Sequence, residues 1–116
     1  MEDPGQRFEN LVAMHLYKWV NFANELGLDD LSLHYVRDKE DHEVDFLICR
    51  KRKPWIAVEC KAHASSNPAS VYYFSEKLNL TKSFVLSREP VSLDIRNNGE
   101  RQVLRMSAAD FLARLV

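Results

Sequence analysis

Two strand-like segments separated by a basic turn constrain the fold more than any other part of the chain. Residues 43–50 read EVDFLICR and residues 55–61 read WIAVECK, and both contain the β-branched and aromatic residues that favour strands. Side chains on a strand alternate between its two faces, so Glu59 and Lys61 share one face of the second segment, and Asp45 has a fixed face in the first. We therefore predict a β-hairpin with charged side chains in its most strand-prone part.

The length of the turn predicts which residues of the two strands oppose each other. If residues 51–53 form the turn, counting back along both strands places Asp45 opposite Glu59. Directly opposed side chains are about 5 Å apart at Cβ, and like charges at that distance destabilise a sheet. A divalent cation between the two carboxylates reverses the sign of the interaction, and Mg²⁺ prefers such oxygen ligands. Lys61 lies on the same face, where its ammonium could approach a phosphate or a metal-bound water.

The rest of the chain contains signals for three helices and four further strands. These are, in order, a helix at about 4–26, a strand at 31–38, a helix that starts at Pro68 after the cap Asn67, a strand at 82–87, a hairpin of 91–95 and 100–106, and a helix capped by Ser107. A helix between two strands favours a parallel crossover. We predict an α/β fold, an α/β sandwich in which helices flank a mixed central sheet, with the order αβββαβ followed by a β-hairpin and a C-terminal helix.

The first helix carries an apolar stripe and one acidic residue of interest. Asp3 can cap this helix, with proline at its first position and Gly27 as its stop. The stripe predicted to face the core consists of Phe8, Leu11, Val12, His15, Trp19, Phe22 and Leu26. At 100° per residue Glu9 lies roughly 100° from the centre of this stripe, near Leu16 and Val20. We expect Glu9 at the border, where a carboxylate can face a site at the sheet edge.

Composition limits the classes of function. A chain of 116 residues suits one compact domain spanning residues 1–116. The formal net charge of -1 provides no overall basic field, so any nucleic-acid contact must come from a local patch. There is no apolar run of about 18 residues and no signal-peptide pattern, which predicts no membrane span and a cytoplasmic location. Cys49 and Cys60 are expected to be free buried thiols.

The residues singled out so far occur together in a known superfamily. Glu9 in an amphipathic first helix, Asp45 in VDF, and Glu59 and Lys61 in VECK resemble the PD-(D/E)xK phosphodiesterases, the restriction-endonuclease-like nucleases. A longer pattern within about residues 5–90, FENLVAMHL, LHYVRDKEDHEVDFLI, AVECK and FVLS, resembles the uncharacterised C-terminal domain of a group of prokaryotic AAA+ ATPases.

The resemblance implies a restriction-endonuclease-like fold and a divalent-metal-dependent nuclease that acts on DNA with Mg²⁺ or Mn²⁺. It implies that Asp45 and Glu59 are metal ligands, that Glu9 is an outer ligand, and that Lys61 orients the attacking water and stabilises charge on the phosphate. It also implies an AAA+ ATPase domain as a partner. No Gly-x-x-x-x-Gly-Lys-Ser/Thr loop occurs in the sequence, so we do not expect this chain alone to hydrolyse ATP.

Less specific interpretations stay open beside this one. The charges of the hairpin could form a solvated face with an ion pair worth about 0–1 kcal/mol, and Glu9 could be a carboxylate favoured by the helix dipole. The fold could serve as a catalytically silent module that regulates or binds an ATPase or forms a homodimer. The basic residues 50–54 lie at the far end of the hairpin, about 15–20 Å from the carboxylates at about 3.3 Å per residue. His63 follows Lys61 by two and could be an accessory base.

Overall fold

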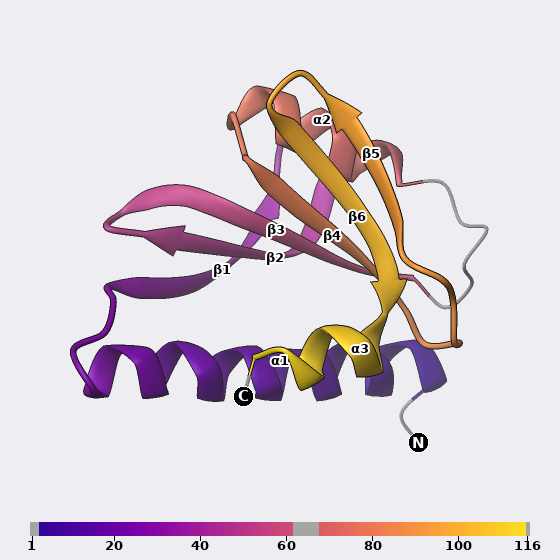
Figure 1. The fold of residues 1–116 in the computed structure, drawn as a ribbon. Coiled ribbons are helices and arrows are strands. Elements are labelled where there is room, and N and C mark those ends of the chain that lie inside the picture. The colour runs from indigo at the N-terminus through magenta and orange to yellow at the C-terminus, as the bar shows by residue number, and fades with distance from the viewer. Residues whose placement is uncertain (1–2, 62–67, 116) are drawn as a thin grey trace.

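The structure, a computed structural model, describes residues 3–61 and 68–115 (Figure 1). Its helices and strands follow the order predicted from the sequence, which confirms the α/β class. The elements are α1 Pro4–Glu25, β1 Leu31–Arg37, β2 Glu43–Arg50, β3 Lys53–Lys61, α2 Ala69–Lys77, β4 Lys82–Ser87, β5 Asp94–Asn98, β6 Arg101–Ser107 and α3 Ala108–Ala113.

The six strands form one mixed sheet in the order β1-β2-β3-β4-β6-β5. Strand β4 runs parallel to both β3 and β6, while the β1–β2, β2–β3 and β5–β6 pairs are antiparallel. The parallel β3–β4 pair requires a crossover connection, and α2 lies within it as predicted. Because of this direction, the C-terminal ends of β3, β4 and β6 lie at the same end of the sheet, next to the N-terminal half of β2.

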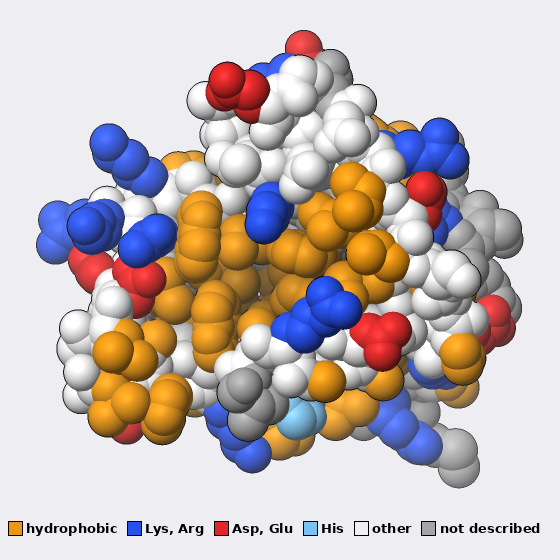
Figure 2. All heavy atoms as spheres, viewed as in Figure 1, with side chains coloured by type: hydrophobic (Ala, Val, Ile, Leu, Met, Phe, Trp, Pro, Cys, Tyr) orange, Lys and Arg blue, Asp and Glu red, His pale blue; other side chains and the backbone are white. Residues whose placement is uncertain are grey.

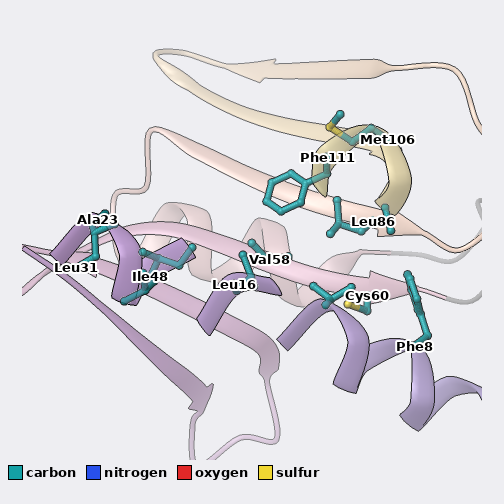
Figure 3. Packing of buried hydrophobic residues seen from close by; sticks show 13 residues of the cluster. Phe8, Leu16, Ala23, Leu31, Ile48, Val58, Cys60, Leu86, Met106 and Phe111 are labelled. Atoms are coloured by element: carbon teal, nitrogen blue, oxygen red, sulfur yellow. The ribbon is translucent and has the colours of Figure 1, made fainter. Parts of the chain in front are cut away.

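Helices cover the sheet from both sides and enclose two hydrophobic cores. The first core lies between the sheet and the helices α1 and α3, and Figure 3 shows Leu16 of α1 beside Val58 of β3 within it. The second core lies on the opposite face, where Val71 and Phe74 of α2 pack on Leu47 and other residues of the sheet. Strand residues contribute alternately to the two cores, as the pleat requires. The sheet therefore presents two different faces to two different layers of helix.

Helix α1 begins and ends as predicted but is rotated from the predicted orientation. The Asp3 carboxylate accepts hydrogen bonds from two N–H groups of the first turn, and Gly27 follows the helix with a φ of 69°. The residues of α1 that are buried are Phe8, Val12, Leu16, Val20 and Ala23. The expected stripe was wrong in part, because its members Leu11, His15, Phe22 and Leu26 are exposed.

The physical reason is that α1 is apolar over more of its circumference than one core can cover. The sheet contacts the row of side chains formed by Val12, Leu16 and Val20. The neighbouring apolar row of α1 remains exposed. Glu9 precedes Leu16 by seven residues, about two turns, so it lies in line with this buried row rather than at its border.

The β2–β3 hairpin has the predicted register away from its turn, but the turn itself differs from the predicted one. Only Lys51 and Arg52 form the turn, and both adopt positive φ, 52° and 67°, as two-residue hairpin turns require. Arg50 therefore pairs with Lys53 rather than with Pro54, which corrects the predicted three-residue turn. A bulge between Ile48 and the following residue adds one residue to β3 and restores the predicted register from there on.

Two further boundaries differ from the predicted ones. Helix α2 begins at Ala69 with Pro68 as its N-cap, and the predicted cap Asn67 lies outside the described residues. Strand β5 runs to Asn98, where it pairs with Arg101, so the turn is shorter than the predicted 96–99. Helix α3 is capped as expected, since the Ser107 hydroxyl accepts a hydrogen bond from the backbone N–H of Asp110 at 3.2 Å.

The rotated face of α1 gives a testable difference between two leucines of one helix. We expect Leu16→Ala to lower the free energy of unfolding by about 2–4 kcal/mol because Leu16 is fully buried. Leu11→Ala, the matched control at 48% exposure, should cost less than about 1 kcal/mol. Urea denaturation followed by circular dichroism measures both values. Equal losses would contradict the orientation of α1 described here.

Candidate functional site

Asp45 and Glu59 lie next to each other at the end of the β2–β3 pair. The observed register joins Phe46 to Val58 and Leu47 to Ala57, so continuing it by one residue sets Asp45 opposite Glu59. The Asp45 carboxylate also accepts a hydrogen bond from the backbone N–H of Cys60 at 2.8 Å. This bond fixes the carboxylate against the residue that separates Glu59 from Lys61. The two strands are thus held together at this end by a side chain rather than by the backbone ladder alone.

Glu59 is a carboxyl group in an almost fully buried position. Its side chain is 7% exposed, in a row of β3 whose neighbours belong to the hydrophobic cores. Burial, followed by the hydrogen bond and the charge repulsion of Asp45, raises the pKa of Glu59 to about 9. The positive charge of Lys61 acts in the opposite direction and lowers that pKa. Without a cation, Glu59 therefore keeps its proton at neutral pH and forms a hydrogen bond with Asp45.

Glu9 joins this pair from a different element. Its place in the buried row of α1 directs it toward the strand ends, and the side chain is half-buried. Burial raises the pKa of Glu9 first, and the charge of Asp45 and a hydrogen bond with it raise it further. Asp45 is therefore the centre of the group, in contact with Glu9 on one side and Glu59 on the other. The structure brings all three predicted carboxyl groups together.

Lys61 supplies the positive charge of the site. It ends β3 two residues after Glu59 and so projects from the same face, and its effect on the Glu59 pKa shows that the two side chains are close. In the sheet, Lys61 lies beside Ser87 of β4, which in turn lies beside Ser107 of β6. Both serines are buried, so the row next to Lys61 is polar but uncharged. His63, predicted as an accessory base, lies outside the described residues.

Arg105 of β6, which lies in the same row of the sheet as Glu59, was not predicted from the sequence. Glu59 pairs with Val85 of β4, and Val85 pairs with Arg105 of β6, so all three side chains project from one face of the sheet. Arg105 lines a cavity of about 380 Å³ together with Arg96 and Tyr72. Asp94 also lines this cavity and forms an ion pair with Arg96 at 3.0 Å, so the cavity carries both signs of charge. Only the parallel register of β3, β4 and β6 could have revealed Arg105, and a single sequence does not show it.

A second cluster of potential ligands lies in the β1–β2 loop. Within the described ranges 3–61 and 68–115, Asp38, Glu40 and His42 are the one group of three whose ligand atoms all lie within 4.8 Å of one another. The Asp38 carboxylate already accepts hydrogen bonds from the backbone N–H groups of Glu40 and His42, both at 2.9 Å. These bonds close the loop, which gives the cluster a structural explanation. The oxygens of Glu9, Asp45 and Glu59 are more widely spaced than this.

Comparison with known proteins assigns the chain to a family. A family model described as a domain of unknown function, DUF4143, matches residues 4–108. The chain belongs to the DUF4143 family. No curated protein and no solved structure matches the chain. None of the helices in the described part of the chain has the length and hydropathy needed to cross a membrane.

The raised pKa of Glu59 predicts how stability depends on pH. Between about pH 4.5, the ordinary pKa of a glutamate, and about pH 9, Glu59 is protonated in the folded state and ionised in the unfolded chain. The unfolded state thus binds fewer protons, and stability falls as the pH rises through this window. We expect Glu59→Gln to raise the free energy of unfolding by about 1–3 kcal/mol near pH 8 and to change it little near pH 5.

Urea denaturation with a chelator at both pH values measures this difference. Glu76→Gln is the matched control, because Glu76 is exposed on α2 and should give no pH-dependent change. A Glu59→Gln variant that is less stable than the wild type near pH 8 would contradict the proposed protonation of Glu59.

Proposed function

We propose that this domain is a divalent-metal-dependent phosphodiesterase of the restriction-endonuclease-like PD-(D/E)xK type and that it acts on DNA. The observation that carries the proposal is that Glu9 and Glu59 both contact Asp45, with Lys61 on the same face as Glu59. A structural role does not require such a group, because three neighbouring carboxyl groups destabilise a fold unless a proton or a cation binds there.

The donor set fits Mg²⁺ or Mn²⁺. Carboxylate oxygens are the ligands that these hard cations prefer. Glu9 and Glu59 each contact Asp45. Burial raises the pKa of the adjacent Cys60 thiol, so a thiolate ligand for a softer metal is disfavoured. A cation at this point would offset the carboxylate charge and polarise a phosphodiester. Asp45 and Glu59 are assigned as its ligands and Glu9 as an outer ligand.

The other groups have roles that follow from their charge and position. Lys61 is the cation on the same face, so it is assigned to orient the attacking water and to stabilise negative charge on the phosphate. Glu9, from the far side of Asp45, would hold that water by accepting a hydrogen bond. Arg105, which lines the neighbouring cavity, would contact a phosphate of the strand beside the scissile bond.

A second candidate is a catalytically silent module that regulates or binds an AAA+ ATPase. The formal net charge of -1 favours it, because enzymes that act on nucleic acid usually carry a basic surface. The two candidates differ in whether a cation binds between Asp45 and Glu59 and whether Lys61 acts on a substrate.

Cleavage of DNA tests the first candidate directly. We expect the chain to nick supercoiled plasmid with Mg²⁺ or Mn²⁺, and Lys61→Ala to reduce the rate by about 100-fold or more, as the loss of a group that stabilises transition-state charge does. Lys53→Ala is the matched control at the opposite end of the same strand and should keep most of the activity. Absence of nicking by the wild type, or equal nicking by Lys61→Ala, argues for the silent module.

Thermal stability with and without a cation tests the site apart from activity. Mn²⁺ binds the folded state only, so it should raise the melting temperature, and more at higher pH because protons compete for the same carboxylates. Asp45→Asn should remove this rise while leaving the fold intact. An equal rise in Asp45→Asn would show that the cation binds elsewhere, for example at Asp38, Glu40 and His42.

A further inference from the structure

Helix α1 presents a second apolar row that the core does not use. Leu11 is 48% exposed, Phe22 is 59% exposed and Leu26 is 57% exposed, although they continue the period of an amphipathic helix. A contiguous row of exposed large apolar residues is uncommon on a monomer and marks an interaction surface more often than a scattered single residue does. This row is therefore unpartnered within the described part of the chain.

Two adjoining cavities extend this row into a groove between α1, α3 and the sheet. One, of about 450 Å³, is lined by Trp19, Phe22 and Leu115 among others, and the second, of about 310 Å³, by Trp19, Trp55 and Leu115 among others. Because Trp19 and Leu115 line both cavities, the two are continuous. Figure 2 shows the apolar side chains gathered in the hollowed centre of this face. We call this surface the tryptophan groove.

The floor of the tryptophan groove is already ordered. Trp19 of α1 and Trp55 of β3 stack on each other with ring centroids 6.4 Å apart and an interplanar angle of 26°. The Arg50 guanidinium lies 5.2 Å from the centroid of the Trp55 ring. This stacked pair, with a cation over one of its rings, is a preformed anchor point, and aromatic residues dominate the energetics of protein interfaces.

The charges on the rim have one sign. The charged residues that line the two cavities are Lys18, Lys82 and Arg114, and no aspartate or glutamate lines either cavity. Among residues 3–61 and 68–115, none of these three cations takes part in an ion pair. In a chain of net charge -1, this is a local concentration of unneutralised positive charge around an apolar floor. The complementary surface is apolar with acidic borders.

We propose that the tryptophan groove binds an amphipathic helix of a partner protein that carries aspartate or glutamate on both borders of its apolar face. Two cavities in a row fit side chains at i, i+3 or i+4, and i+7 of a helix, whereas one enclosed pocket would suit a small molecule. A second copy of this chain is disfavoured as the occupant, because a two-fold interface would bring the same basic rims together. The groove lies on the α1 and α3 side of the sheet, and Arg105 and Val85 lie on the other side.

Matched peptides test this proposal. Three helices of about 20 residues share one leucine face and differ only in carrying Glu, Gln or Lys at the borders. The two tryptophans of the chain both line the groove, so intrinsic fluorescence reports binding there directly. We expect the Glu peptide to shift the emission with saturation and to bind at least about 10-fold more tightly than the Lys peptide, a preference that weakens at high salt.

Reversing the charges of cations that line the tryptophan groove tests whether these cations determine the preference among the peptides. Lys18 and Arg114 are exposed, so a Lys18→Glu, Arg114→Glu double variant should fold and should reverse the preference toward the Lys peptide. Lys39→Glu, an exposed lysine in the β1–β2 loop, is the control that should leave the preference unchanged. Absence of a fluorescence shift with every peptide, or equal affinity for all three, overturns the proposal. Sedimentation that shows a dimer, lost in Phe22→Ser, would identify a second copy as the occupant instead.

Discussion

The hydrogen bond from the Cys60 amide to the Asp45 carboxylate organises the end of the sheet that holds the candidate site. It joins β2 to β3 where the regular ladder stops, and it fixes the carboxylate opposite Glu59. A hydrogen-bonded side chain has fewer rotamers available, so this bond keeps the Asp45 carboxylate beside Glu59. The rows beyond this point, with Lys61, Ser87 and Ser107, keep their positions because β3, β4 and β6 continue in parallel from the same register.

This arrangement stores unfavourable electrostatic energy in the fold. Burial and the neighbouring Asp45 raise the pKa of Glu59 to about 9 and also raise the pKa of Glu9, so the proton on Glu59 reduces the charge repulsion among these carboxyl groups. Stability at neutral pH is therefore lower than it would be with an uncharged, hydrogen-bonding residue at position 59. Sites of this kind commonly reduce the stability of the proteins that contain them. The cost is local to the strand ends, because the clusters packed on the two faces of the sheet are hydrophobic.

The parts of the candidate site that can be predicted from the sequence are those that depend on counting residues along two strands joined by a short turn. Asp45 and Glu59 were predicted to oppose each other because the alternation of a strand is strict and a hairpin turn is short. The two-residue turn and the bulge each change the count by one, and their effects cancel, so the predicted pair is correct although the predicted turn is not. Arg105 could not be predicted in this way, because no turn connects β3 to β6 and the register across β4 depends on the whole sheet.

The orientation of α1 on the sheet could not be predicted from the pattern of apolar residues in the sequence. Periodicity identifies an apolar helix, but it cannot tell which of two apolar rows meets the sheet and which meets a partner. The row that faces the sheet contains Glu9 and contributes to the candidate site, and the row left over contains Phe22 and contributes to the tryptophan groove. Glu9 and Lys18 are nine residues apart, about 14 Å along the axis at about 1.5 Å per residue. At 100° per residue the two residues also project from opposite faces of α1, so a helix seated beside Lys18 would contact the face turned away from Glu9, and an influence of a partner on the candidate site would pass through the position of α1.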